Sequence, residues 1–76
     1  MKIEVLGTGC TKCKTLYEAV LAAVKEKGVA AEIVKVEDIT SIMKYGVMST
    51  PALVINGRVM FSGKTASVGE IAGMLS

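Results

Sequence analysis

The pattern of apolar residues changes period several times along the chain, and each change marks a new predicted element. Lys2–Leu6 is a mostly apolar run, which is typical of a largely buried strand. From Cys10 onward the spacing becomes that of one helical face, with apolar residues at Leu16, Ala19, Val20, Ala23 and Val24. Gly28 suits the left-handed position that ends a helix. In Ala30–Val36 successive residues fall on two alternating faces, which predicts a second strand. One face would carry Ala30, Glu32, Val34 and Val36, and the other Ala31, Ile33 and Lys35.

The next part of the chain predicts a short helix and a hairpin. Asp38 is a suitable N-cap for a short helix that ends at Gly46. The apolar runs Ala52–Ile55 and Arg58–Phe61 flank the pair Asn56-Gly57. An Asn-Gly pair between two apolar runs is the strongest short-range signal for a β-hairpin. We therefore predict two antiparallel strands joined by a tight turn.

A last helix is predicted by Ser67 and Glu70, which have the spacing of a capping box. The predicted order is then β-α-β-α-β-β-α. A strand–helix–strand unit of this kind is expected to be parallel and right-handed. The sequence thus predicts one α/β domain over residues 1–76, a mixed four-stranded sheet with helices on both faces.

Chain length and apolar content fit this small domain. With 76 residues, of which 51% are hydrophobic, there is room for one modest packed core. The longest unbroken apolar run, Ala19–Val24, falls far short of the roughly 20 residues that span a bilayer. The N-terminal residues also lack the apolar stretch of a signal peptide. We therefore expect no membrane segment and a cytoplasmic location.

The charged and aromatic residues argue against two other classes of function. The net charge is only +2, the lysines are scattered and aromatic residues make up 4% of the chain. A nucleic-acid-binding protein would need a concentrated basic face or aromatic platforms. Histidine is absent, which excludes histidine-based acid–base catalysis and a Cys/His zinc site within one chain.

The motif Cys10-Thr11-Lys12-Cys13 contains both cysteines of the chain and opens the first predicted helix. Side chains at this spacing share one helical face, about 5–6 Å apart at Cβ. A disulfide needs about 3.5–4.5 Å, so a slightly tightened first turn can form it and a relaxed turn can keep it open. The helix N-terminus also favours a thiolate. In a cytoplasmic protein such a pair is catalytic or metal-binding more often than structural.

The motifs and the element order together carry a family resemblance. The run Gly7-Thr8-Gly9-Cys10 opens the C-x-x-C motif, and Thr50-Pro51 stands directly before the third predicted strand. With the order β-α-β-α-β-β-α, the chain resembles the thioredoxin fold in its shortest, glutaredoxin-sized form. It is most similar to the small thioredoxin-like redox-active disulfide proteins of prokaryotes, and the likeness covers its whole length.

The resemblance implies a role for several residues. Cys10 would be the nucleophile and Cys13 the resolving thiol. Pro51 would be a cis-proline that faces the sulfur atoms, and Thr50 would offer its backbone to a bound peptide. Gly63, after the last strand, would keep the wall beside the disulfide open.

Two further residues have both a functional and a structural interpretation. Lys12 would stabilise a thiolate of the motif, or it is a solvated lysine on an exposed turn. Glu4 lies six positions before Cys10, the offset at which thioredoxin carries a buried acid that takes up the proton of its resolving cysteine. The alternative is that Glu4 points to solvent at the end of the sheet.

The leading hypothesis is a thiol–disulfide oxidoreductase that reduces disulfide-containing protein substrates with the Cys10/Cys13 couple. The resemblance implies a flavoprotein of the thioredoxin-reductase type as electron donor and no cofactor besides the redox-active disulfide. The alternative is a soft-metal carrier that binds Cu(I) or Zn²⁺ through the same motif. Metal carriers with this motif, however, often have methionine where Thr8 stands, and they follow a β-α-β-β-α-β order. A redox sensor without turnover is a third hypothesis.

Overall fold

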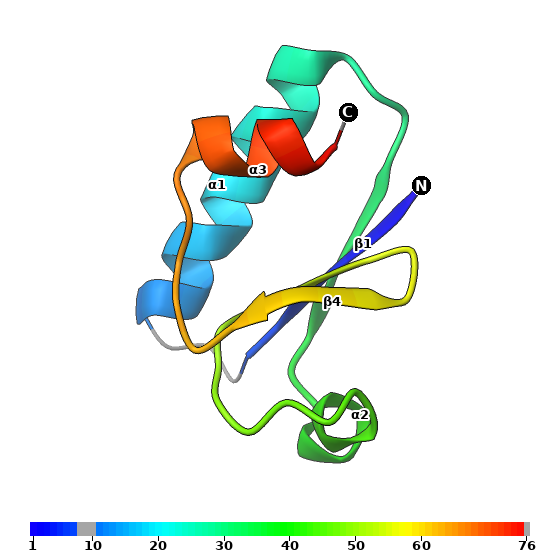
Figure 1. Cartoon of the computed structure of the whole chain (residues 1–76), viewed down its shortest axis with the longest axis vertical. Coiled ribbons are helices and arrows are strands. Elements are labelled where there is room, and N and C mark those ends of the chain that lie inside the picture. The colour runs from blue at the N-terminus through cyan, green and yellow to red at the C-terminus, as the bar shows by residue number, and fades with distance from the viewer. Residues whose placement is uncertain (8–10, 76) are drawn as a thin grey trace.

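The computed structural model describes residues 1–7 and 11–75. The elements are β1 (Lys2–Leu6), α1 (Thr11–Lys27), β2 (Glu32–Val36), α2 (Ile39–Lys44), β3 (Ala52–Ile55), β4 (Arg58–Ser62) and α3 (Val68–Met74). Their order is the predicted β-α-β-α-β-β-α (Figure 1). Among the described residues, no helix has the length and apolar character needed to cross a membrane.

The four strands form one mixed sheet in the order β2-β1-β3-β4. β1 and β2 are parallel, whereas β3 is antiparallel to both β1 and β4. Leu6, the last residue of β1, therefore lies opposite Ala52, the first residue of β3. This register places the end of β1 and the start of β3 at one edge of the molecule, where α1 also begins.

Helices cover both faces of the sheet, as predicted. On one face, α1 and α3 pack with the strands around Ile3, Val5 and Leu53. On the other face, Ile42 of the short helix α2 packs with Leu6 and its neighbours. Successive side chains of a strand point to opposite faces, which assigns alternate residues of β1 to the two clusters.

The predicted caps and turn are present. Asn56 and Gly57 have positive φ angles of 51° and 82°, as a tight hairpin of this type requires. The Asp38 carboxylate accepts a hydrogen bond from the Ser41 N–H at the start of α2. Ser67 and Glu70 form the reciprocal capping box of α3. These local signals therefore fixed the ends of the elements as the sequence predicted.

The second strand is shorter than predicted, beginning at Glu32 instead of Ala30. In the parallel register Glu32 lies opposite Lys2, and its N–H donates to the Met1 carbonyl oxygen over 2.8 Å. Residues 30 and 31 thus lie beyond the N-terminal end of β1. The apolar residues continue there, but β1 begins opposite Glu32 and, within the described part of the chain, offers them no pairing partner.

Candidate redox site

The candidate site lies where β1 ends and α1 and β3 begin. Cys13 is in the first turn of α1, and its side chain is only 6% exposed. Cys10, the predicted nucleophile, lies outside the described residues, so the geometry below is that around Cys13. Lys12 is exposed in the same turn of the helix. The first turn of α1 thus presents one buried sulfur atom and one solvated cation.

Gly7 lies directly against Cys13. A Cβ atom added to Gly7 would overlap the Sγ atom of Cys13 and lie 3.0 Å from its Cβ atom. The Gly7 N–H donates to the Val36 carbonyl oxygen over 2.9 Å, so Gly7 continues the pairing of β1 with β2. The close approach of strand and helix therefore depends on a residue without a side chain at position 7.

The Thr50-Pro51 segment lies beside this contact. The peptide bond between the two residues is cis. Pro51 is fully buried, whereas Thr50 is exposed. The Cβ atom of Thr50 is 4.0 Å from the position of a Cβ atom added to Gly7. The fold thus brings Thr50 next to Gly7, which packs against Cys13, although Thr50 is far from both in the sequence.

Gly63 holds the other side of the Thr50-Pro51 segment. Its N–H donates to the Pro51 carbonyl oxygen over 2.9 Å, and its φ angle is 73°. A Cβ atom at this position would lie 3.0 Å from the Cβ atom of Ser49. Gly63 therefore lies next to the loop that precedes β3, without a side chain that would cover it.

Glu4 is buried, at 9% exposure, but on the face of the sheet opposite α1. Its neighbours on the adjacent strands are Val34 and Val54. The Tyr45 hydroxyl donates a hydrogen bond of 2.6 Å to the Glu4 carboxylate, and this bond, with burial, raises the pKa of Tyr45. Glu4 thus ties β1 to the end of α2, and the sheet separates its carboxylate from the side of Cys13.

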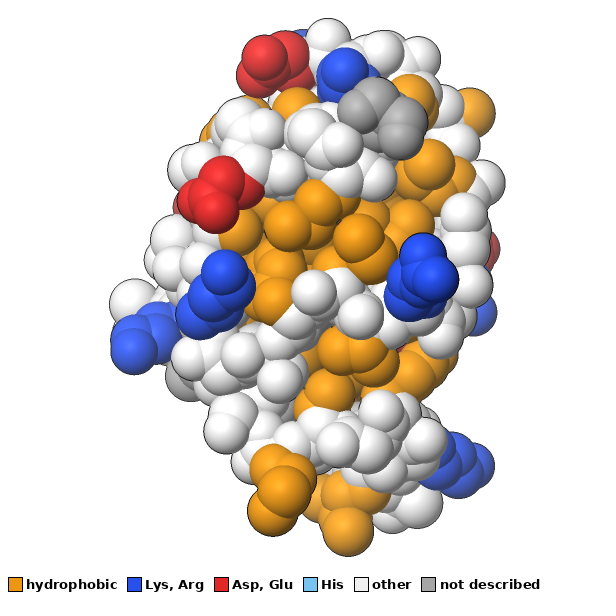
Figure 2. Space-filling view, viewed as in Figure 1, with side chains coloured by type: hydrophobic (Ala, Val, Ile, Leu, Met, Phe, Trp, Pro, Cys, Tyr) orange, Lys and Arg blue, Asp and Glu red, His pale blue; other side chains and the backbone are white. Residues whose placement is uncertain are grey.

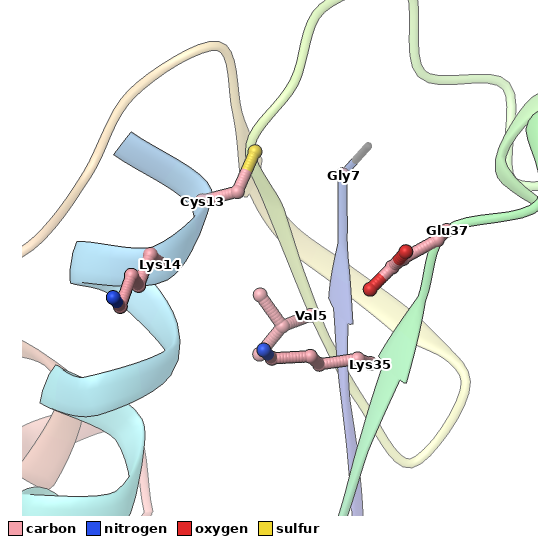
Figure 3. Close-up of a pocket in the computed structure, with 6 residues that line it drawn as sticks. All are labelled: Val5, Gly7, Cys13, Lys14, Lys35 and Glu37. Atoms are coloured by element: carbon pink, nitrogen blue, oxygen red, sulfur yellow. The ribbon is translucent and has the colours of Figure 1, made fainter. Parts of the chain in front are cut away.

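A small pocket opens beside Cys13 on the α1 face of the sheet (Figure 3). Its lining residues are Val5, Gly7, Cys13, Lys14, Lys35 and Glu37. The sequence analysis did not single out the charged residues of β2 and its C-terminal end. The parallel pairing of β1 with β2 puts the carboxyl ends of the two strands side by side. The face of the sheet on which Lys35 and Glu37 lie depends on the register of that pairing, which cannot be read from the sequence.

Apolar side chains are exposed at the α2 end of the molecule, at the bottom of Figure 2. Ile39, Met43 and Met48 are 60%, 68% and 99% exposed. Met48 stands two residues before Thr50. Exposed apolar side chains that gather next to a site are typical of surfaces that contact other proteins.

The described residues contain no group of three or more His, Cys, Asp or Glu side chains placed to hold a metal ion. The predicted soft-metal ligands are Cys10, outside the described residues, and Cys13.

Comparisons with known proteins all point to one family. The family profile described as a thioredoxin domain matches residues 1–76. A protein named thioredoxin from Methanothermobacter thermautotrophicus is 38% identical over 76 residues, covering 100% of this chain and 99% of its own length. Another protein named thioredoxin, from Methanocaldococcus jannaschii, is 46% identical over 69 residues, covering 91% of this chain and 79% of its own length.

Proposed function

Because the chain belongs to the thioredoxin family of protein-disulfide oxidoreductases, we propose that its redox couple is Cys10/Cys13. The observation that carries this proposal is the position of Cys13. Its sulfur atom is buried against Gly7, at the start of a helix and close to Thr50. A sulfur atom in this position is shielded from bulk solvent. Cys10, its proposed partner, is only three positions earlier in the sequence.

The reaction proceeds by two exchanges. The Cys10 thiolate attacks a substrate disulfide, a mixed disulfide forms, and the first substrate sulfur leaves as a thiolate. The Cys13 sulfur then attacks the Cys10 sulfur, the mixed disulfide breaks, and the second substrate sulfur leaves. Two electrons pass to the substrate, and the protein is left with a Cys10–Cys13 disulfide. The burial of Cys13 at 6% exposure supports its role as the second, resolving thiol.

Thr50, Pro51 and Gly63 bind the substrate chain in this proposal. An extended peptide can pair with an exposed backbone segment through main-chain hydrogen bonds. Thr50 is exposed, while the buried Pro51 and the hydrogen bond from Gly63 hold the segment in place. The exposed apolar residues Met43 and Met48 extend the surface available to a protein substrate.

Thioredoxins in general exchange electrons with disulfide substrates and with reductases. For this chain we propose disulfide-containing proteins as substrates and a flavoprotein of the thioredoxin-reductase type as electron donor. The chain binds no cofactor in this proposal, because the disulfide itself carries the electrons. Lys12, exposed beside the couple, adjusts its potential. A cytoplasmic location and the absence of a nucleic-acid partner stay predictions.

The experiment is dithiothreitol-driven reduction of a protein disulfide by the wild type, Cys10→Ser and Cys13→Ser. We expect both variants to lose turnover and only Cys13→Ser to accumulate a mixed disulfide with the substrate. Ala22→Ser, an exposed change on the same helix, is the matched control and should keep full activity. Turnover in Cys10→Ser would contradict the proposal. An inactive wild type that binds Cu(I) through both cysteines would favour the soft-metal carrier.

A further inference from the structure

The resolving step requires that Cys13 lose a proton, because the thiolate and not the thiol is the nucleophile. The Cys13 side chain is 6% exposed, so bulk water has little access to its sulfur atom. The pocket beside Cys13 is the route by which a proton acceptor can reach it. The identity of that acceptor follows from the groups that line the pocket.

The charged side chains that line this pocket come from α1, from β2 and from the residue that follows β2. Lys14 belongs to α1, Lys35 to β2, and Glu37 directly follows β2. Among the described lining residues, Glu37 alone carries a carboxylate, the group that accepts a proton at neutral pH. Glu37 is an exposed residue. Figure 3 shows its carboxylate turned from the end of β2 toward β1, with Cys13 across β1 in this view.

The backbone holds Glu37 in this position. The hydrogen bond from the Gly7 N–H to the Val36 carbonyl oxygen, 2.9 Å long, joins the ends of β1 and β2 one residue before Glu37. Gly7 is also the residue in direct contact with Cys13. Glu37 therefore follows the residue that is bonded to Gly7, and Gly7 in turn packs against the buried sulfur atom of Cys13.

The other acid near this end of β1 is excluded by its orientation. Glu4 is on the opposite face of the sheet, where the Tyr45 hydroxyl donates to its carboxylate. Lys35 has its ammonium group 4.6 Å from the ring centroid of Tyr17, so its positive charge is held on the α1 face.

From these contacts we infer that Glu37 is the proton acceptor for Cys13 in the resolving step, an inference that rests on the proposed function. In the mixed disulfide, the Cys13 S–H proton passes through one water molecule to the Glu37 carboxylate. The electron pair left on Cys13 forms the bond to the Cys10 sulfur. The bond from Cys10 to the substrate sulfur breaks, its electron pair leaves with that sulfur, and the resulting thiolate takes a proton from solvent. The protein dithiol is oxidised and the substrate disulfide is reduced.

The test is rapid-mixing kinetics of the reduced protein with an aromatic disulfide reagent whose released thiolate is coloured. The first release reports the attack by Cys10 and the second reports resolution by Cys13. For Glu37→Gln we expect an unchanged first phase and a second phase slowed by about tenfold to a hundredfold at neutral pH. The deficit should shrink at alkaline pH, where Cys13 loses its proton directly to hydroxide.

Two further variants make the result specific to the carboxylate. Glu32→Gln changes an exposed acid at the far end of the same strand and should resolve at the wild-type rate. Glu37→Asp keeps a carboxylate and should recover part of the lost rate. A second phase in Glu37→Gln within about twofold of the wild type, or an equal loss in Glu32→Gln, would overturn the inference. A wild type that gives no second release would instead overturn the proposed function.

Discussion

Gly7 and Cys13 are in such close contact that no side chain fits between them. A Cβ atom on Gly7 would overlap the Cys13 sulfur and lie 3.0 Å from the Cys13 Cβ atom. The end of β1 therefore sets how deeply the first turn of α1 can pack. The position of the Cys13 sulfur atom depends on the absence of a side chain on the neighbouring strand.

Gly7→Ala should destabilise the protein by about 1–3 kcal/mol, the usual cost of forcing an extra methyl group into a packed site. The measurement is urea unfolding of the reduced protein. Gly73→Ala is the matched control, because among the described atoms a Cβ atom there has no neighbour within 4 Å. Since Gly73 lies within α3, alanine should stabilise the protein by about 0.5–1 kcal/mol. Equal stability of Gly7→Ala and the wild type would show that the packing at Cys13 relaxes freely.

Tyr45→Phe should lower the free energy of unfolding by about 1–3 kcal/mol, because it leaves the buried Glu4 carboxylate without its donor. The measurement is denaturant unfolding at neutral pH. Adding Glu4→Gln gives a double-mutant cycle. In the Glu4→Gln background, Tyr45→Phe should lower the free energy of unfolding by less than it does in the wild type. Additive losses would mean that the two side chains do not depend on each other.

The same pair predicts how stability changes in alkaline solution. The hydrogen bond to Glu4, with burial, raises the pKa of Tyr45 above its usual value of 10.0. A raised pKa in the folded state gives stability that is fully present below the unfolded pKa and is lost as the pH rises through the folded pKa. The stability difference between the wild type and Tyr45→Phe should therefore narrow above pH 10. A difference that stays constant up to about pH 12 would contradict this linkage.

Gly63→Ala should cost more stability than Gly57→Ala. Both residues have positive φ angles, 73° and 82°, so alanine is strained in either place. Only Gly63 has a close neighbour, since its added Cβ atom would lie 3.0 Å from the Cβ atom of Ser49. Thermal unfolding of the two variants isolates the effect of this contact. A larger loss in Gly57→Ala would show that the Ser49 contact is unimportant.

Lys12→Gln should make the reduction potential of the couple more negative, because Lys12 favours the thiolate and thus the reduced form. Lys12 is exposed, so the shift should stay below about 20 mV. Equilibration with a glutathione buffer measures it, and Lys25→Gln, near the other end of α1, is the control. A shift of the opposite sign would mean that Lys12 does not stabilise the thiolate.

The order of elements was predictable because each end carries its own local signal. Asn56-Gly57 predicted the hairpin, and Ser67 with Glu70 predicted the start of α3; both are confirmed. Such signals depend only on neighbouring residues, so they can be read without knowing the tertiary structure. The length of β2 was predicted wrongly, because strand pairing depends on where β1 begins.

The surroundings of the site were less accessible from the sequence. The offset between Glu4 and Cys10 suggested a proton acceptor, but the side-chain alternation of β1 turns Glu4 toward Tyr45. Glu37 shows no signal in the sequence, because its place beside Cys13 arises from the pairing of two strands that are distant in the chain. Which residues line one pocket is therefore known only from the folded structure.

The central claim is that Cys10 and Cys13 form a reversible dithiol–disulfide couple, and a redox titration tests it most directly. The protein is equilibrated over a series of potentials in metal-free buffer, its thiols are alkylated, and the products are resolved by mass. We expect a reversible two-electron transition with a midpoint between about −300 and −180 mV. The absence of an intramolecular disulfide at every potential would contradict the account and direct attention to Cu(I) and Zn²⁺ binding.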